Sequence, residues 1–172
     1  SYFMVVLCSS LMVHSAQALN PTFQENPDEG GCYGSSVVSF TQGNQSNGQP
    51  VAENRSHTDR ALGEPDKSNA VDGFVSLGIN GSITIQFAGY VYDEPGDDIM
   101  LYETSYAGDA CTGNQTERAL IELSDGVTWV AYPTEICRDG AIDIAGLGLD
   151  YVTQIKITDV TTVGGDGFDV DG

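Results

Sequence analysis

The residues best suited to chemistry are carboxylates in an acidic loop. The loop holds four of them within six residues, beside the Pro95-Gly96 turn: Asp93, Glu94, Asp97 and Asp98. Calcium binds about six to eight oxygens, which carboxylates and turn carbonyls supply. The loop therefore predicts a calcium site, and a solvated acidic loop without an ion is the alternative.

Two further acidic groups are candidates for the same chemistry. Near the C-terminus lie Asp166, Asp169 and Asp171, and the last two share one face of a strand because side chains alternate along it. Glu64 and Asp66 flank a proline in a third turn. No group has EF-hand spacing, and the sequence does not choose between the 93–98 and 166–171 regions.

The sequence gives little indication of a catalytic site. The chain after residue 18 has a single histidine, His57, and no G-x-S-x-G elbow accompanies it. One histidine and three widely spaced cysteines do not make a zinc site. Paired carboxylates could serve a glycosidase, but 25 acidic residues produce such pairs by chance. The chain is therefore predicted not to be an enzyme.

Aromatic side chains suggest a ligand platform. Tyr92 and Tyr106 are the candidates for it, because sugar faces stack on exposed rings while amides and carboxylates bind hydroxyl groups. Trp129 lies between Val127 and Ala131 on one strand face, which predicts that it packs in the core instead.

Alternating strands must position these residues. In Ser82–Phe87, Ile83 and Ile85 alternate with polar residues, as in a strand with one buried face. Asp125-Gly126 is a hairpin dipeptide. No segment shows sustained helical periodicity. Residues 57–62 fit either a short helical turn or part of a long surface loop. Further strands are expected at residues 36–41, 99–104, 118–124, 127–133, 142–144, 151–158 and 167–172. This pattern predicts an all-β jelly roll or other β-sandwich with no substantial helix.

The cysteines predict one disulfide. Cys111 and Cys137 flank the two strands joined by Asp125-Gly126, so the open end of that hairpin brings them together. Export permits a bridge between them. Cys32 is then left over and needs a partner elsewhere or stays free.

The ends of the chain suggest an exported protein. Residues 1–18 have an apolar run followed by the A-x-A site Ala16-Gln17-Ala18, as in a signal peptide. Residues 19–35 form a polar lead-in without regular structure, and residues 36–172 a single domain. Because the pattern stops within a strand, we expect the domain to continue in a longer, multidomain chain.

The charge excludes some partners. The net charge is −19, and every charged residue follows residue 18. Nucleic acid needs a basic footprint, and anionic membranes repel such a chain. We therefore expect neither nucleic-acid binding nor membrane insertion.

The ordered motifs resemble a β-sandwich module of bacterial exported and cell-surface proteins, similar to galactose-binding-like jelly rolls. The motifs are ALGEPD (Ala61–Asp66), FVSLGINGSITIQF (Phe74–Phe87), GDDIMLYET (Gly96–Thr104), IELSDGVTW (Ile121–Trp129), AIDIAGLGLDYVTQIKITDV (Ala141–Val160) and GDGFDVDG (Gly165–Gly172). The resemblance implies a structural calcium ion near the terminal strand, at Asp169 and Asp171, and ligand binding by loops.

Together these features predict an extracellular or cell-surface binding or adhesion module. Its expected partner is carbohydrate or another surface protein, and calcium is its expected structural ion. A purely structural spacer is the alternative, and a glycoside hydrolase is the third reading.

Overall fold

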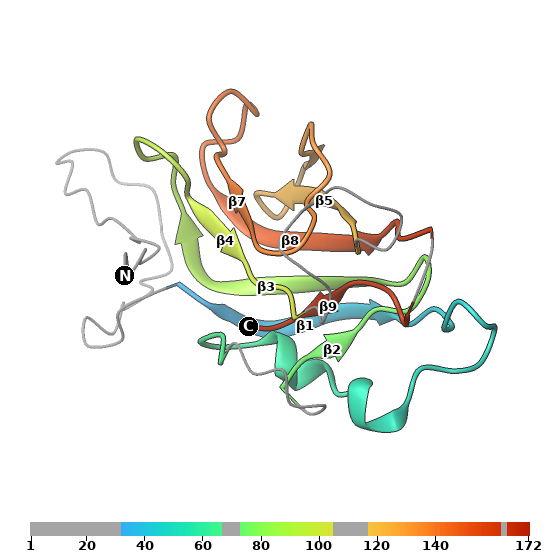
Figure 1. Cartoon of the computed structure of the whole chain (residues 1–172). Helices are drawn as coiled ribbons and strands as arrows, with labels where there is room; N and C mark the ends of the chain where they lie inside the picture. Colours follow the sequence, from blue (N-terminus) through green and yellow to red (C-terminus); the bar gives the residue numbers. More distant parts are fainter. Residues whose placement is uncertain (1–31, 67–72, 105–116, 163–164) are drawn as a thin grey trace, which may run out of the picture.

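A five-stranded antiparallel sheet forms the main layer of the protein. The computed structural model describes residues 32–66, 73–104, 117–162 and 165–172 (Figure 1). The strands lie in the order β1-β3-β8-β5-β6. Their bounds are β1 Gly34–Thr41, β3 Ser82–Val91, β5 Ala119–Ser124, β6 Trp129–Ala131 and β8 Val152–Asp159. β3, which the alternation at Ser82–Phe87 predicted, pairs with both β1 and β8.

Two short antiparallel pairs are the other strand pairs within the described residues. β2 (Val75–Ser76) pairs with β9 (Asp169–Val170), and β4 (Ile99–Leu101) pairs with β7 (Gly140–Ile142). Buried residues of all four short strands join those of the main sheet in one apolar cluster. The core therefore lies between the main sheet and the short pairs, as in a sandwich.

Alternation along the central strands supplies this core. On β3, Ile83 and Ile85 are buried, and they pair with Ile157 and Ile155 of β8. Polar Thr84 and Gln86 alternate with these isoleucines: Gln86 is half-buried, whereas Thr84 is buried and its hydroxyl accepts that of Ser39 at 3.0 Å. The apolar side chains thus cover one face of the sheet, which is the arrangement that burial of apolar area favours.

The prediction of an all-β sandwich is confirmed. Each expected strand appears within a few residues of its predicted bounds, and the jelly-roll assignment stays a prediction. Two single-turn 3₁₀ helices occur in the long loop after β1. They are η1 (Glu53–Arg55) and η2 (Thr58–Ala61), and the second confirms the helical-turn alternative for residues 57–62.

The prediction for Trp129 was wrong. Its side chain is 43% exposed, and Val127 in the adjoining turn is 89% exposed. Trp129 pairs with Ser124 across the edge strand β6, and this register turns it to the solvent side of the sheet. A strand of three residues at a sheet edge has too few neighbours to bury both of its faces.

The described residues include little of the predicted N-terminal segments. The predicted signal peptide, residues 1–18, lies outside the described residues, and so does most of the lead-in, although β1 begins at Gly34 within its expected range. Across the part of the chain that the structure describes, every helix is too short or too polar to cross a lipid bilayer.

A buried aspartate connects the main sheet to the turn between β2 and β3. Asp159, at the end of β8, is fully buried. Its Oδ2 accepts the Asn80 N–H at 3.0 Å and its Oδ1 accepts the Phe168 N–H at 2.9 Å. Its own N–H donates to the Gly81 carbonyl at 2.8 Å. One side chain thus satisfies donors from two distant segments.

Two glycines allow the backbone at Gly78 to pass close to the backbone at Gly43 and at Gly167. Gly78 and Gly167 have φ values of +73° and +84°, which L side chains rarely adopt. A Cβ atom on Gly78 would overlap the Gly43 carbonyl, and one on Gly167 would lie 2.7 Å from the Gly78 carbonyl carbon. Gly78 of the FVSLGING motif and Gly167 of the GDGFD motif are therefore required by packing.

Replacing Asp159 should destabilise the fold. Asp159→Ala leaves the buried Phe168 N–H and the part-buried Asn80 N–H without an acceptor. A buried N–H group without an acceptor costs about 1–3 kcal/mol, and a part-buried one costs less because water can reach it. We expect a loss of roughly 1–4 kcal/mol in the free energy of unfolding, measured with urea. Asp125→Ala is the matched control, because exposed Asp125 also accepts two N–H groups that water can satisfy. Equal losses in both variants would contradict this role.

Candidate functional site

The burial of carboxylates is the main electrostatic problem of this chain, which has 25 acidic and 6 basic residues. Asp159 is satisfied by backbone N–H groups, as described above. Asp166 is satisfied by Arg55, whose Nη1 lies 2.9 and 2.7 Å from its two carboxylate oxygens. Two clusters of three carboxyl groups also occur among the described residues, and they are the candidate metal sites.

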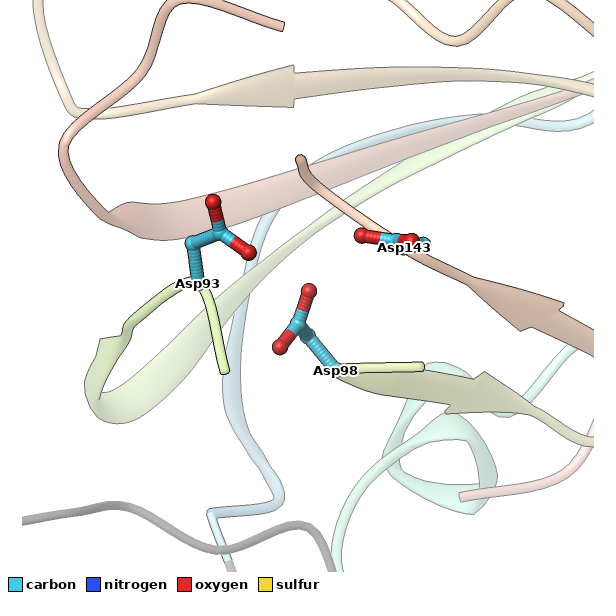
Figure 2. Close-up of side chains that lie close together, drawn as sticks. All are labelled: Asp93, Asp98 and Asp143. Carbon is cyan, nitrogen blue, oxygen red and sulfur yellow. The ribbon is translucent and has the colours of Figure 1, made fainter. Parts of the chain in front are cut away.

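The outer cluster consists of Asp93, Asp98 and Asp143, whose carboxylates point toward one another (Figure 2). One oxygen from each lies within 4.8 Å of the others. Ile99 of β4 pairs with Ile142 of β7, and this register places Asp98 opposite Asp143. Asp93 comes from the loop that follows β3.

The outer cluster combines a buried member with an accessible opening. Asp98 is buried, and its two oxygens accept the N–H groups of Glu94 and Ile144, each at 2.9 Å. Asp93 is exposed and Asp143 is half-buried. Like charges directly opposite each other across a strand pair are destabilising. A cation would relieve this repulsion, and the ligands are all oxygens, which calcium prefers.

The inner cluster consists of Glu103, Glu117 and Asp169, again with one oxygen each within 4.8 Å of the others. They come from three segments: the residues after β4, the residues before β5, and β9 itself. Backbone hydrogen bonds run from Thr104 N to the Asp169 carbonyl and from Asp171 N to the Tyr102 carbonyl. Glu103 therefore lies directly beside β9.

The carboxylate oxygens of the inner cluster have few hydrogen-bond donors. The Glu103 side chain has no exposed surface. Both of its carboxylate oxygens, and Oε2 of Glu117, are buried without a hydrogen-bond donor. Arg138 provides one positive charge, with its Nε 4.0 Å from a Glu103 oxygen. Asp169 is better placed, because the Ser76 hydroxyl donates to it at 2.5 Å.

Burial and mutual repulsion raise the pKa of all three inner carboxyl groups. The pKa of Glu103 rises from 4.5 to about 7, chiefly through burial. The pKa of Glu117 rises to about 9 through burial, through its hydrogen bond to Glu103 and through the charge of Glu103. That of Asp169 rises from 3.8 to about 8 through burial and the charge of Glu117. Without a cation, the cluster therefore retains protons near neutral pH.

The residues predicted from sequence divide among several environments. Asp93 and Asp98 belong to the outer cluster, whereas Asp97, from the same loop, is exposed and belongs to neither cluster. Asp169 belongs to the inner cluster. Its neighbour Asp166 is paired with Arg55 instead.

The remaining predicted ligands lie near the chain end. Asp171 is buried, and one of its carboxylate oxygens accepts the Asp66 N–H at 3.2 Å. Asp66 and Glu64 have exposed side chains. The turn that was expected to bind calcium therefore contributes a backbone N–H group to Asp171.

Three cluster members were missed in the sequence. Asp143 had a local signal, because it separates two apolar residues, Ile142 and Ile144, in a predicted strand. Its pairing with Asp98 depends on the β4–β7 register, which sequence alone does not provide. Glu103 and Glu117 had no such signal, since their proximity arises from contacts between segments distant in the chain.

A tyrosine cluster lies where β3 ends and β8 begins. Tyr90 and Tyr92 are 42% and 41% exposed, and they flank buried Val91. The Tyr151 ring packs edge-on against Tyr90, with centroids 4.8 Å apart, and lies 6.2 Å from the Tyr92 centroid. Three rings thus form an aromatic surface next to Asp93. Tyr106, the other predicted ring, lies outside the described residues.

The structure describes only one of the two cysteines of the predicted Cys111–Cys137 bridge. Cys137 and Cys32 are both in the disulfide-bonded state. Cys111 lies outside the described residues, so its pairing with Cys137 stays a prediction.

Comparison with known proteins adds no assignment. No family model, curated protein or solved structure matches this chain. The resemblance to surface β-sandwich modules therefore stays a prediction, and function must be argued from the residues themselves.

The inner cluster should make the metal-free protein less stable at high pH. A raised pKa in the folded state favours folding fully below the ordinary pKa, and this contribution is lost as pH rises through the folded value. With chelator present, the unfolding free energy should therefore fall between pH 5 and pH 9.

Glu117→Gln should flatten this fall, because glutamine does not titrate. Urea unfolding at each pH measures the effect. Glu135→Gln is the control, since Glu135 is exposed beside Arg118 and outside both clusters. Parallel pH curves for wild type and Glu117→Gln would show that the inner cluster does not cause the fall.

Proposed function

We propose that this protein is an exported, non-catalytic binding module for carbohydrate at the cell surface or in the extracellular matrix, with calcium as a structural ion. The observation that carries the proposal is a cluster of three tyrosines at the end of the main sheet, in which Tyr90 and Tyr92 are exposed and Tyr151 is half-buried. Sugar rings stack on such surfaces through apolar contacts. Apolar side chains that cluster at a surface are typical of interaction sites, whereas single exposed ones need no explanation.

Polar side chains along the same strands supply partners for sugar hydroxyl groups. The Gln154 amide donates to the Gln86 side-chain oxygen at 2.9 Å on the face turned away from the core. On the next strand pair, Lys156 and Glu122 form an ion pair at 2.6 Å. Amide, ammonium and carboxylate groups can all bond hydroxyl groups. This face therefore combines stacking and hydrogen-bonding groups.

The outer cluster supports calcium as the structural ion. Asp93 follows Tyr92 directly, so an ion held by Asp93, Asp98 and Asp143 would order the loop beside the tyrosine cluster. Calcium accepts this kind of all-oxygen, partly solvated site. It would also neutralise charge on a protein whose net charge is −19.

The buried position of the inner cluster supports a non-catalytic role. Glu103 and Glu117 resemble a catalytic acid–base pair in that their pKa values are raised. A glycosidase carboxyl group must contact the glycosidic oxygen or the sugar ring. The Glu103 side chain has no exposed surface, so it cannot contact a glycan bound at the surface.

The carbohydrate proposal predicts that tyrosine substitutions weaken glycan binding. A glycan array with calcium present identifies a ligand, and titration calorimetry then compares variants. Tyr90→Ala and Tyr92→Ala should each weaken binding about tenfold, equivalent to about 1.4 kcal/mol. This loss is within the range expected for an aromatic contact.

Val38→Ala is the control for this experiment, because Val38 is 54% exposed on the edge strand β1 and distant in sequence from the tyrosines. Its affinity should match that of the wild type. Absence of binding to every glycan would favour the structural-spacer function. Equal affinity in the tyrosine variants and the wild type would place the ligand elsewhere.

A further inference from the structure

We propose that Glu103, Glu117 and Asp169 form a second, buried binding site for a divalent cation of the calcium type, distinct from the outer cluster. The ion would connect β9 to Glu103, two residues after β4, and to Glu117, two residues before β5. The proposal concerns the integrity of the fold and does not depend on the carbohydrate function.

The unsatisfied oxygens are the first argument for this site. Among the described residues, the only buried side-chain oxygens without a hydrogen-bond donor are both carboxylate oxygens of Glu103 and Oε2 of Glu117. Burying a charged group without a partner is strongly unfavourable. By contrast, buried Asp98 and Asp159 each accept two backbone N–H groups. Glu103 and Glu117 hydrogen-bond to each other, which requires a proton on one of them. When both are ionised, the inner cluster lacks the backbone donors that the other buried acids have.

The geometry is the second argument. Ligand oxygens on a sphere of about 2.4 Å radius around calcium can lie no more than about 4.8 Å apart. One oxygen from each of the three inner carboxyl groups meets this limit. The ligand chemistry also fits, because the group contains carboxylates alone, without histidine or cysteine. A hard cation such as calcium prefers these ligands.

The charge balance is the third argument. When all three inner carboxyl groups are ionised, they carry three negative charges, and the nearest positive charge is that of Arg138, whose Nε lies 4.0 Å from Oε2 of Glu103. A divalent cation would bring the local sum to zero. Asp139, beside Arg138, adds further negative charge near Glu103. Arg55 is already held by Asp166, so it contributes little to balancing the inner carboxylates.

The other charged groups around the site also favour a positive ligand. Asp166 and Asp159 both raise the pKa of Glu117 through their negative charge. Asp166 also raises that of Asp169, whereas Arg55 lowers it. Most neighbouring charges therefore favour a positive ligand, which can be a proton or a metal ion. The test below separates the two.

Calcium titration of the full chain tests the proposal, with the bound ions counted by equilibrium dialysis. Wild type should bind an ion that Glu117→Gln loses or binds at least tenfold more weakly. Glutamine preserves the shape of the side chain, and its amide can donate to Glu103, so the variant should fold without metal. Circular dichroism in chelator checks the fold. Glu103→Gln is a second variant with the same expected loss.

Two controls assign the ion. Asp143→Asn removes a ligand of the outer cluster and should leave the Glu117-sensitive ion bound. Glu135→Gln, outside both clusters, should bind calcium like the wild type. The proposal is overturned if Glu117→Gln and Glu103→Gln bind as many calcium ions as the wild type, with equal affinity. It is also overturned if wild type binds no calcium beyond the ion lost in Asp143→Asn.

These outcomes are separate from the carbohydrate function. Loss of the inner ion with glycan binding retained supports this site alone. Failure of glycan binding in a protein that still loses one calcium in Glu117→Gln contradicts only the carbohydrate proposal.

Discussion

A chain with 25 acidic and 6 basic residues can form a core only if its buried carboxylates find positive partners. Most of these partners are backbone N–H groups. Asp159 holds the turn between β2 and β3 in this way, and Asp98 holds the start of β4 against β7. These acids act as structural connectors between segments, so the acidic composition contributes to the fold itself as well as to surface charge.

The same constraint links the fold to the proposed sites. β9 lies between β2 and the residues after β4, and its Asp169 faces the Ser76 hydroxyl and the two inner glutamates. At the other end of β4, the outer cluster adjoins the tyrosine surface. A cation at either cluster would therefore stabilise the strand pairs that cover the core. Metal binding at the outer cluster would thus affect the geometry of the face proposed to bind carbohydrate.

Much of the fold could be predicted because strand alternation and turn residues are local signals. Ser82–Phe87 and Asp125-Gly126 marked β3 and the β5–β6 hairpin correctly. Trp129 was wrongly assigned to the core, since an edge strand exposes residues that a central strand buries. The clusters were only half predicted. Asp93, Asp98 and Asp169 came from acid-rich segments, but their partners depend on pairing between distant strands, which local patterns do not encode.

The most direct test of the central claim is a crystal structure of the protein grown with calcium, with anomalous scattering to locate the ion. The account predicts a peak between Glu103, Glu117 and Asp169, about 2.3–2.6 Å from their carboxylate oxygens. Carboxyl groups that contact one another directly, with no peak between them at saturating calcium, would contradict it. Protons would then be the partners of these buried acids.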